Sequence, residues 1–423
     1  MIRFYNGKVL TLSAGSTDIT EDEVWIDGDT ICYAGPAKER KPSFEREINL
    51  NGNLLLPGFK NAHTHTGMTF CRSLADDVPL QPWLFEQIFP LEAKLTPERV
   101  YLFTKLGVLE HLSGGVTAAF DMYYHRASIA QAFADAGLRC VLCGTNGTPE
   151  QVEDEFSRFA GGRFDPLVTF IPAIHAEYTT GLEDIKIVAE LVQRHKAPFF
   201  THSSETEKET KECVERHGLT PTELFDSLGL YDYGGGAYHC VWFNEHDIEI
   251  FKKRGLWVVS CPASNAKLAS GVAPLTKYMD AGLTNLALGT DGPSSNNAMD
   301  MFREMYLACV LQKLQSGDAA ACDAAEILKA ACQGGARAMG LPGCDCIAPG
   351  KQADLTVIGL HAPNMQPIIN IPKNLVYSGS KQNVKLTMVA GRVLYEDGEY
   401  FIGEDPEKIY AAAAAEVKKM LTE

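Results

Sequence analysis

Residues 54–65 read Leu54-Leu55-Leu56-Pro57-Gly58-Phe59-Lys60-Asn61-Ala62-His63-Thr64-His65, an apolar run that ends in two histidines one residue apart. Side chains at alternate positions of a strand point to the same side, so His63 and His65 can present both imidazoles to one metal ion. A histidine pair at a strand end is also compatible with a simple polar rim. The pair therefore indicates a metal site only when other strands supply further ligands.

Further ligand-type residues do follow later apolar runs. His175, His202 with Glu205, His239 and Asp291 stand where such a run gives way to a loop. Short apolar runs that alternate with helical segments are typical of βα units and a parallel sheet. Eight runs predict an α/β fold of the (β/α)₈ TIM barrel type, with its chemistry at the C-terminal strand ends. The runs are residues 54–62, 116–123, 139–143, 167–174, 198–201, 237–242, 256–261 and 285–289.

The two ends of the chain have a different texture. Residues 1–56 alternate apolar and polar positions in short bursts between turn residues, and the same texture returns between 354 and 395. Such bursts are typical of antiparallel sheets. We therefore predict two domains. Residues 1–56 and 350–423 form a composite β-sandwich with a C-terminal helix, and residues 57–349 form the barrel inserted between them.

Composition limits the partners and the compartment. The 423 residues carry a formal net charge of −16, which repels a phosphate backbone, so we expect no nucleic acid polymer as a partner. No apolar segment approaches the length of a membrane span, and the N-terminus lacks the pattern of a signal peptide. The twelve cysteines are scattered through predicted strands and helices, as expected of reduced thiols. We expect a cytoplasmic protein without a membrane partner.

The strand ends together offer the ligands of a catalytic metal centre. Such a zinc-type site needs three or four nitrogen and oxygen ligands and one position for water. His63 and His65 from the first strand, His202 from the fifth and Asp291 from the eighth supply them. Coordination lowers the pKa of the water, which can then attack as hydroxide near neutral pH. We expect one divalent ion, zinc, with iron as the alternative.

Three residues near these ligands are candidates for proton transfer. Glu205 lies three residues after His202, where a carboxylic acid can protonate a ring nitrogen of the substrate. His239 can hydrogen-bond the attacking water or the leaving group, and Asp291 can carry a proton from the water to the leaving ammonia. Structural interpretations stay open, because Glu205 also suits the first turn of a helix and His239 also suits a buried structural role.

These motifs together resemble the amidohydrolase superfamily. Within it, the chain is similar to the aminohydrolases that deaminate S-adenosylhomocysteine, 5′-methylthioadenosine and related adenosines, and the chlorotriazine hydrolases share much of the pattern. The resemblance covers essentially the whole chain. It rests on Pro57-Gly58 followed by His63-Thr64-His65, on His202-Ser203-Ser204-Glu205-Thr206, on Tyr238-His239-Cys240, and on Gly289-Thr290-Asp291-Gly292-Pro293-Ser294-Ser295-Asn296-Asn297.

The resemblance implies hydrolytic deamination of a 6-aminopurine nucleoside, which gives the 6-oxopurine and ammonia. It implies that His63, His65, His202 and Asp291 bind one divalent metal ion, usually zinc, and that Glu205 and His239 transfer protons. It further implies substrate contacts from Trp83 and Glu92, after the first strand, and from His175, after the fourth. By residue type alone, Trp83 suits an apolar helix face. His125 is a weaker candidate for a substrate contact.

One departure from the resemblance concerns the substrate. Members that act on S-adenosylhomocysteine are expected to offer arginine to its carboxylate from the loop after the third strand, and residues 144–153 contain none. Methylthioadenosine or adenosine is therefore at least as plausible. Guanine, cytosine or a triazine remains an alternative, as does a non-catalytic scaffold protein. A two-metal site is disfavoured because residues 167–174 lack a bridging lysine. The sequence leaves a homo-oligomer open.

Overall fold

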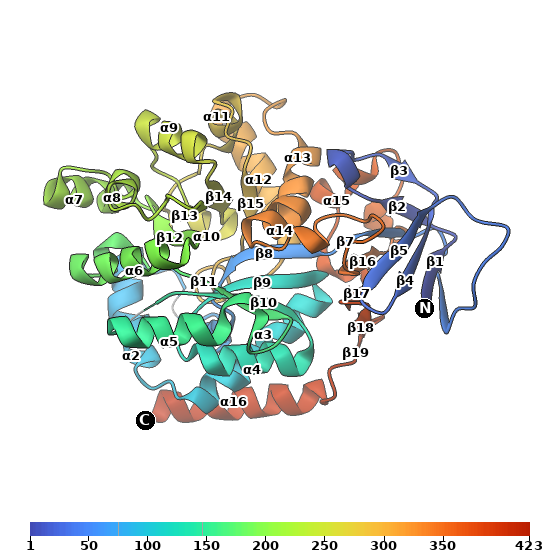
Figure 1. Ribbon diagram of the computed structural model, residues 1–423, viewed down its shortest axis with the longest axis horizontal. Helices are drawn as coiled ribbons and strands as arrows, with labels where there is room; N and C mark the ends of the chain where they lie inside the picture. Colours follow the sequence, from blue (N-terminus) through green and yellow to red (C-terminus); the bar gives the residue numbers. More distant parts are fainter. Residues whose placement is uncertain (75, 146) are drawn as a thin grey trace.

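The computed structural model describes residues 1–74, 76–145 and 147–423, with the backbone alone at Leu80. Figure 1 shows two parts side by side. In the larger part, strands from the middle of the chain run through the interior with helices around them, and in the smaller part strands from both ends of the chain gather. The helices and strands of the larger part alternate along the chain, as the sequence predicted.

The strands of the larger part are short and buried. They are β8 (Phe59–Thr64), β9 (Val116–Met122), β10 (Arg139–Cys143), β11 (Val168–Ile171), β12 (Phe199–Ser203), β13 (Gly235–His239), β14 (Trp257–Ser260) and β15 (Leu286–Leu288). Those of the smaller part are β1 (Ile2–Tyr5), β2 (Lys8–Leu10), β3 (Ile19–Thr20), β4 (Glu23–Asp27), β5 (Thr30–Gly35), β6 (Arg46–Asn49), β7 (Leu54–Pro57), β16 (Leu355–Ile358), β17 (Val384–Val389), β18 (Arg392–Glu396) and β19 (Glu399–Tyr400).

The helices lie between these strands and after them along the chain. They are α1 (Leu80–Pro82), α2 (Phe89–Glu92), α3 (Pro97–Ser113), α4 (Arg126–Ala136), α5 (Pro149–Phe159), α6 (Leu182–His195), α7 (Glu207–His217), α8 (Pro221–Ser227), α9 (Glu245–Arg254), α10 (Pro262–Lys267), α11 (Leu275–Asp280), α12 (Met301–Ser316), α13 (Ala324–Lys329), α14 (Gly335–Ala338), α15 (Ile371–Tyr377) and α16 (Pro406–Thr422). Two π-helical turns, η3 (Trp83–Ile88) and η6 (Ala330–Gly334), are continuous with their neighbours.

The interior strands form two parallel sheets of four, in the orders β11-β10-β9-β8 and β12-β13-β14-β15. The sheets meet at both edges. A parallel bridge between Ala173 and Phe200 connects the ends of β11 and β12. The amides of Thr290 and Asp291 donate to the carbonyl of His63, at 3.0 Å each, and so tie the end of β15 to β8. This is a TIM-barrel-like α/β arrangement, which brings all eight C-terminal strand ends together.

The first predicted strand is in fact two. Residues 54–62 were predicted as one run, but the chain divides at Gly58 into β7, which joins the terminal strands, and β8, which enters the interior. Gly58 packs so closely against the neighbouring strand that a Cβ there would lie 2.1 Å from Cγ2 of Thr117. Glycine is therefore required at the junction, and the prediction of one continuous strand was wrong.

The smaller part contains a seven-stranded sheet, β19-β18-β17-β16-β7-β2-β3, and a four-stranded sheet, β5-β4-β1-β6. In the larger of these sheets β16 pairs with β7, so strands from the two ends of the chain are neighbours. Residues of both sheets, including Phe4, Val24, Val357 and Leu386, share one hydrophobic cluster. Burial of these side chains holds the two ends of the chain together.

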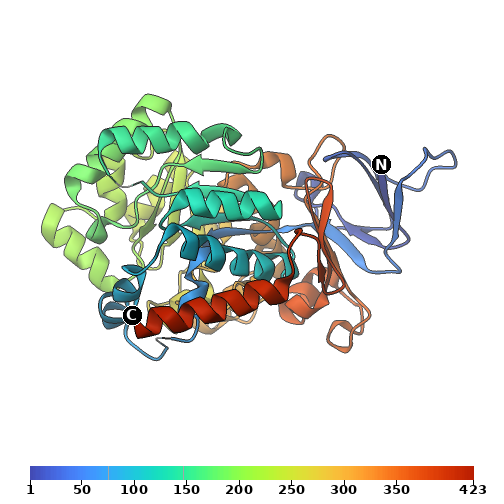
Figure 2. The same ribbon diagram turned by 90° about the horizontal axis from the view of Figure 1, so that it is seen from below.

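The C-terminal helix returns to the larger part. Helix α16 begins after Asp405, as predicted, and its N-cap carboxylate accepts from the amide of Glu407. Figure 2 shows α16 running from the terminal strands along the outside of the larger part. Arg99 of α3 donates to Glu416 at 2.9 Å. Within the described residues, the model has no helix with the length and apolar character needed to cross a bilayer.

Candidate active site

A cavity of about 450 Å³ opens at the C-terminal ends of the interior strands. This size is ordinary for a small-molecule site. The predicted site residues line it, except His63, which is fully buried beside His65. The lining thus includes His65, Trp83, Glu92, His175, His202, Glu205, His239 and Asp291. Side chains from distant parts of the sequence therefore meet in one place.

The four predicted metal ligands form one buried cluster. One ligand atom from each of His63, His65, His202 and Asp291 lies within 4.8 Å of the others. Nε2 of His65 is 3.0 Å from Oδ1 of Asp291, and Nε2 of His63 is 3.5 Å from the same oxygen. The strand-end arrangement therefore brings three imidazoles and one carboxylate to a common centre.

In His65 and His202, a hydrogen bond from the other ring nitrogen fixes the direction of the ligand nitrogen. Nδ1–H of His65 donates to the carbonyl of Met122, and Nδ1–H of His202 donates to the carbonyl of His175 at 2.7 Å. Both rings consequently direct Nε2 into the cluster. A ligand nitrogen aimed by a backbone carbonyl on the other ring nitrogen is a recurrent feature of metal sites.

Asp291 is held in a similar way. Its Oδ2 accepts from the hydroxyls of Ser264 and Ser295, each at 2.6 Å, which leaves Oδ1 for the histidines. Its backbone is left-handed, with φ of 58°. A non-glycine residue in this region is strained, and such strain is common at functional sites.

The electrostatics of the cluster favour metal-binding protonation states at His63, His202 and Asp291. Burial lowers the pKa of His63 to about 3 and, together with the neighbouring histidines, holds the pKa of His202 well below its ordinary value. Burial opposes ionisation of Asp291, but the neighbouring imidazoles of His63 and His65 outweigh it and hold its pKa well below the usual range. For His65 burial is outweighed by Asp291, which raises its pKa to about 9. A cation at the centre would take the place of that proton.

The donor set fits a divalent ion. Both ring nitrogens of His63 are buried and have no hydrogen-bond partner among the described residues. A buried imidazole left in this state is costly unless something else binds it. Three imidazoles and a carboxylate are the ligands that zinc and similar ions take in catalytic sites.

Glu205 reaches the cavity from the turn between β12 and α7. Thr206 caps α7, and Glu209 accepts from the amides of Ser204 and Glu205 at 2.9 and 2.8 Å. Oε1 of Glu205 accepts from the hydroxyl of Ser270 at 3.2 Å. Glu205 thus precedes the N-cap, and its carboxyl lines the cavity instead of capping the helix. Burial raises its pKa, which favours the protonated acid.

His239 ends β13 with φ of 69°, a left-handed and strained backbone. Its ring stacks on His202, with centroids 5.3 Å apart, and Nδ1 hydrogen-bonds Oδ1 of Asn265 at 2.7 Å. Burial opposes a charge on the ring, but Glu205 and Asp291 outweigh it and raise the pKa. The imidazole therefore lies between the metal ligands and the acid.

The predicted substrate contacts form another part of the wall. Oε1 of Glu92 accepts from the hydroxyl of Tyr123 at 2.6 Å, and burial raises the pKa of Glu92. Trp83 belongs to η3 and is buried, yet its Nε1 has no partner among the described residues. His175 is accessible from the cavity, and its Nδ1 contacts Oγ1 of Thr179 at 2.6 Å.

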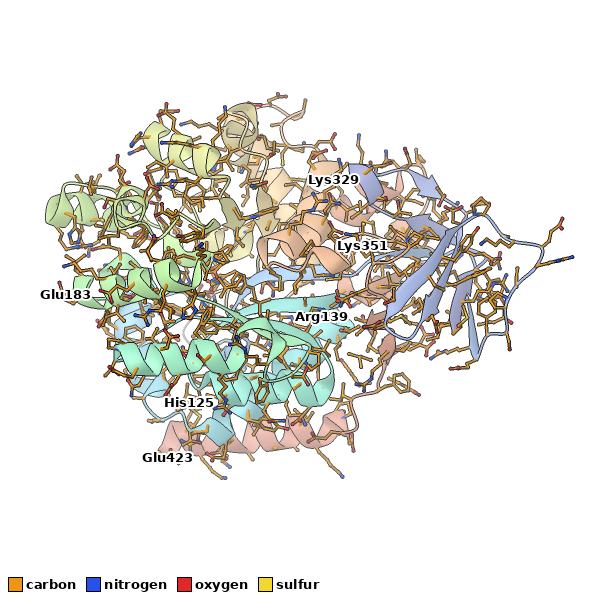
Figure 3. The ribbon with its side chains drawn as sticks, viewed as in Figure 1. His125, Arg139, Glu183, Lys329, Lys351 and Glu423 are labelled. Carbon is orange, nitrogen blue, oxygen red and sulfur yellow. The ribbon has the colours of Figure 1, made fainter. Side chains whose placement is uncertain are left out.

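The weaker candidate His125 was wrong. It precedes α4 with φ of 52°, is exposed, and does not line the cavity, whereas its neighbour Arg126 does. Figure 3 shows His125 at the edge of the larger part. In the loop after β10, Asn146 lies outside the described residues, and Gly144 and Thr145 line the cavity.

Several lining or supporting residues were missed by the sequence analysis. They are Tyr123, Arg126, Ser264, Asn265, Ser270 and Ser295. Ser295 stands inside the motif that contains Asp291, and Ser264 and Asn265 lie three and four residues after the seventh apolar run. Their signal was a short polar segment after a strand, in the position where chemistry gathers.

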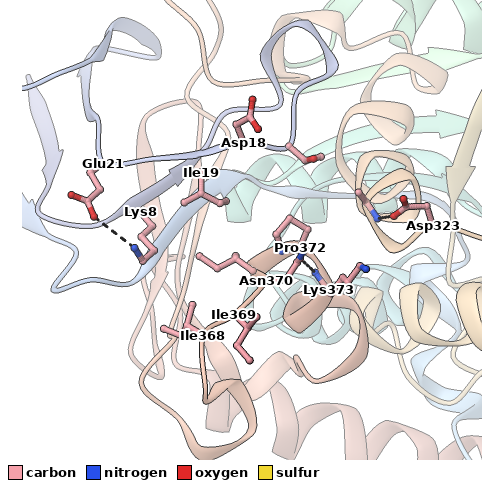
Figure 4. Close-up of a pocket in the computed structure, with 13 residues that line it drawn as sticks. Lys8, Asp18, Ile19, Glu21, Asp323, Ile368, Ile369, Asn370, Pro372 and Lys373 are labelled. Atoms are coloured by element: carbon pink, nitrogen blue, oxygen red, sulfur yellow. Dashed lines mark hydrogen bonds and ion pairs between the residues drawn. The ribbon is translucent and has the colours of Figure 1, made fainter.

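A second hollow, of about 590 Å³, lies between the N-terminal strands and the starts of α13 and α15. Figure 4 shows Lys8 turned toward Glu21, and the two charged groups are 3.7 Å apart. Asp323 accepts from the amide of Ala325 as the N-cap of α13. Lys8, Glu21 and Asp323 thus have structural uses, and the strand-end cavity is the candidate site.

Comparison with known proteins identifies the family of the chain. A model of the amidohydrolase family matches residues 54–394. The chain belongs to this family. Its match includes every strand that leads into the cavity and all four residues of the cluster. The predicted family membership is confirmed.

Three family relatives cover nearly the whole chain. The 5-methylthioadenosine/S-adenosylhomocysteine deaminase of Pelotomaculum thermopropionicum is 36% identical over 414 residues, which are 96% of this chain and 95% of that protein. The 5′-deoxyadenosine deaminase of Methanothermobacter thermautotrophicus is 37% identical over 381 residues, 88% of this chain and 89% of that protein. A crystal structure of an adenosine deaminase from Xanthomonas campestris with bound zinc has a TM-score of 0.92 and 31% identity, and covers 100% of this chain and 99% of that one.

Proposed function

We propose that this protein is a metal-dependent deaminase of a 6-aminopurine nucleoside. The observation that carries the proposal is the buried cluster of His63, His65, His202 and Asp291, which adjoins an acid and a further histidine in one cavity. The names of the relatives support the substrate class. The reaction adds the oxygen of water to C6 of the purine, and the 6-amino group leaves as ammonia.

The cluster would hold one divalent ion, zinc in our proposal, with iron as the alternative. When bound, the ion supplies an acidified water as the nucleophile near neutral pH. The neighbouring histidines keep Asp291 ionised, and the two serine hydroxyls on its Oδ2 fix the direction of this carboxylate. An ionised Asp291 can accept a proton from the attacking water and pass it to the leaving amino group.

Glu205 and His239 complete the proton transfers. Glu205, whose pKa is raised by burial, holds a proton that it gives to N1 of the purine as oxygen adds to C6. The second proton of the water returns to Glu205 when ammonia leaves, so the acid is regenerated. His239 hydrogen-bonds the attacking water and restrains its direction.

The remaining wall would hold the ribose and the 5′ group. Glu92, fixed by Tyr123, accepts hydrogen bonds from the ribose hydroxyls, while Trp83 covers the nucleoside and His175 contacts it. Arg126 lines the same cavity, but its Nε donates to Glu155 at 2.6 Å. A guanidinium already paired with a carboxylate attracts a substrate carboxylate less strongly. We therefore favour a neutral 5′ group, as in methylthioadenosine, 5′-deoxyadenosine or adenosine, over S-adenosylhomocysteine.

The proposal extends to the domains and the setting of the protein. Edge contacts at Ala173–Phe200 and His63–Thr290 support a closed (β/α)₈ barrel over residues 57–349. The shared cluster of the terminal strands supports a composite β-sandwich of residues 1–56 and 350–423. Twelve unpaired cysteines within the described residues support a reducing compartment such as the cytoplasm. The net charge of −16 supports a small-molecule partner over nucleic acid.

The test is ammonia release by metal-loaded protein from a panel of compounds. The panel contains 5′-methylthioadenosine, adenosine, S-adenosylhomocysteine, guanine, cytosine and a chlorotriazine, with chloride release measured for the last. We expect turnover of the adenosines, with those that carry a neutral 5′ group preferred. Turnover of guanine, cytosine or the triazine alone would contradict the nucleoside assignment. A protein that holds metal but transforms none of the panel would contradict the proposed reaction.

A further inference from the structure

One short segment contacts all three residues that we assign to proton transfer. Residues 262–270 comprise helix α10, which begins directly after β14, and the turn that follows it. Ser264 donates to Oδ2 of Asp291 at 2.6 Å, and Ser270 donates to Oε1 of Glu205 at 3.2 Å. Asn265 bonds Nδ1 of His239 at 2.7 Å. The three partners come from the ends of three different strands, β15, β12 and β13.

Asn265 has the most specific of these contacts. Its side chain is 1% exposed, and its Nδ2 has no partner among the described residues. Its backbone is fixed at both ends, because its amide donates to Cys261 and its carbonyl accepts from Ser270. The bond to His239 is thus the only hydrogen bond that this buried amide side chain makes within the described part of the chain. The use of an amide side chain at this position is therefore that bond.

The direction of the bond fixes the tautomer of His239. Oδ1 of Asn265 can only accept, so Nδ1 of the imidazole must carry the hydrogen. In the neutral ring Nε2 is then the unprotonated nitrogen, and His239 lines the cavity. An unprotonated Nε2 can accept a hydrogen bond from the attacking water, whereas the other tautomer would offer it a donor.

We propose that Asn265 is a positioning residue, which holds His239 in its Nδ1–H tautomer and so prepares it to accept from the nucleophile. The inference rests on the proposed function for its catalytic consequence, but the tautomer itself can be observed without turnover. Ser264 and Ser270 place Asp291 and Glu205 from the same segment, so residues 262–270 set the relative position of the whole proton-transfer group.

The test compares three variants of the zinc-loaded protein. Asn265→Ala removes the acceptor, and Asn265→Asp restores an acceptor oxygen. Gln312→Ala is the matched control, since it removes another buried amide, which bonds the backbone of Ala273 and Thr276 and touches none of the proposed site residues. Steady-state kinetics, zinc content and thermal unfolding are measured for each on the preferred nucleoside.

We expect Asn265→Ala to lower kcat about 10- to 100-fold, the usual cost of removing such a support, with KM changed less than about twofold and zinc content unchanged. Asn265→Asp should recover most of kcat, and Gln312→Ala should lose stability without a change in kcat. Wild-type kcat in Asn265→Ala would overturn the proposal. Equal losses of kcat in Asn265→Ala and Gln312→Ala would also overturn it, as would an Asn265→Asp variant no better than Asn265→Ala.

A spectroscopic readout separates this inference from the proposed function. ¹⁵N-histidine spectra of the zinc-loaded protein, with the His239 signal assigned by its loss in His239→Gln, report the protonated ring nitrogen. We expect the Nδ1–H tautomer in the wild type and its loss in Asn265→Ala. An Nε2–H tautomer in the wild type would overturn the inference. Absence of turnover together with the expected tautomer would contradict only the proposed reaction.

Discussion

Strand β8 has buried polar groups at both of its ends, and the two ends differ in how those groups are satisfied. At the start of the strand, Nζ of Lys60 donates to the carbonyl of Gly58 at 2.9 Å and to Oγ1 of Thr117 at 2.6 Å. Nearby, Arg139 makes two 2.9 Å bonds to Asp354. Figure 3 shows Arg139 on the side that faces the terminal strands. At the other end, both ring nitrogens of His63 have no hydrogen-bond partner among the described residues.

The difference separates a structural cluster from a functional one. Buried polar groups are normally hydrogen-bonded, so Lys60, Arg139 and Asp354 obey the rule and His63 does not. Asp354 also accepts from the amide of Ala390, which leaves little capacity for any ligand. Burial and charge alone would not distinguish these clusters. The unsatisfied nitrogens of His63 do, and they point to a metal ion.

The largest effect should follow from removal of a metal ligand. His202→Ala takes away an imidazole whose Nε2 faces the cluster, so we expect loss of both zinc and activity. The loss should exceed the roughly 100- to 10,000-fold that a single proton-transfer group supplies. Metal analysis of the purified variant and ammonia assays check this. A His202→Ala variant with full metal content would place the ion elsewhere.

A change at the proton-transfer group should leave the metal in place. Glu205→Gln keeps the size and the contact with Ser270 but cannot donate the acidic proton, so kcat should fall about 100- to 10,000-fold. Zinc content should equal that of the wild type. Near-normal turnover by Glu205→Gln would eliminate the assigned role.

A change near the start of β8, where the buried polar groups are hydrogen-bonded, should lower the stability of the fold and leave the catalytic rate unchanged. Arg139→Ala leaves the carboxylate of Asp354 buried without its partner, which should cost about 3 to 5 kcal/mol of unfolding free energy. Denaturant titration gives this loss, and kcat per zinc-loaded molecule should not change. The double variant Arg139→Met with Asp354→Leu serves as the control, because replacement of both charges should cost less than the single change. A fall in kcat without a fall in the free energy of unfolding would contradict a purely structural role for this ion pair.

The ion pair of Arg126 and Glu155 shares a feature with each end of β8. Arg126 is paired within the chain, as the structural cluster is, yet it lines the cavity. Glu155→Gln removes the neutralising carboxylate, so kcat/KM for S-adenosylhomocysteine should rise relative to methylthioadenosine. We expect up to about a tenfold change in the ratio, equivalent to 1.4 kcal/mol. Competition assays with both nucleosides measure it. An unchanged ratio would show that Arg126 does not sense the 5′ group.

A small effect of comparable size concerns a hydrogen-bonded carboxylate in the terminal strands. Burial opposes ionisation of Glu23, but hydrogen bonds from Arg3, Lys41 and Trp25 outweigh it and lower its pKa to about 2. The contribution of a group with a depressed pKa is present above its unfolded pKa and is lost as pH falls. Thermal unfolding between about pH 5 and pH 2 should therefore show a steeper loss in the wild type than in Glu23→Gln, by about 1 to 2 kcal/mol. Parallel curves would contradict the assignment.

Much of the fold could be predicted because buried parallel strands appear as continuous apolar runs. The boundaries were less predictable. Strand β13 begins at Gly235, two residues before the predicted run. The backbone there approaches its neighbour so closely that a Cβ at Gly235 would lie 1.9 Å from the carbonyl oxygen of Phe199, so the position requires glycine and has no apolar side chain. It ends at His239, since His239 and Cys240 both have left-handed backbones. Close approach and backbone strain of this kind leave no apolar pattern in the sequence.

The site was predictable to a different extent for ligands and for their supports. Histidines and carboxylates at strand ends are rare enough to stand out, and the structure brings His63, His65, His202 and Asp291 together. Asn265 could not be predicted, since asparagine is common in loops and its importance depends on the end of β14 meeting the end of β13. Such contacts arise from the packing of neighbouring strands.

The most direct test is a zinc titration of the metal-free protein, with ammonia release from the preferred nucleoside as the readout. We predict no turnover without metal, a linear rise with added zinc, and a plateau at one equivalent per chain, while His202→Ala shows no rise. Full turnover by the metal-free protein, or a plateau that requires two equivalents, would contradict a single catalytic ion at the unsatisfied end of β8.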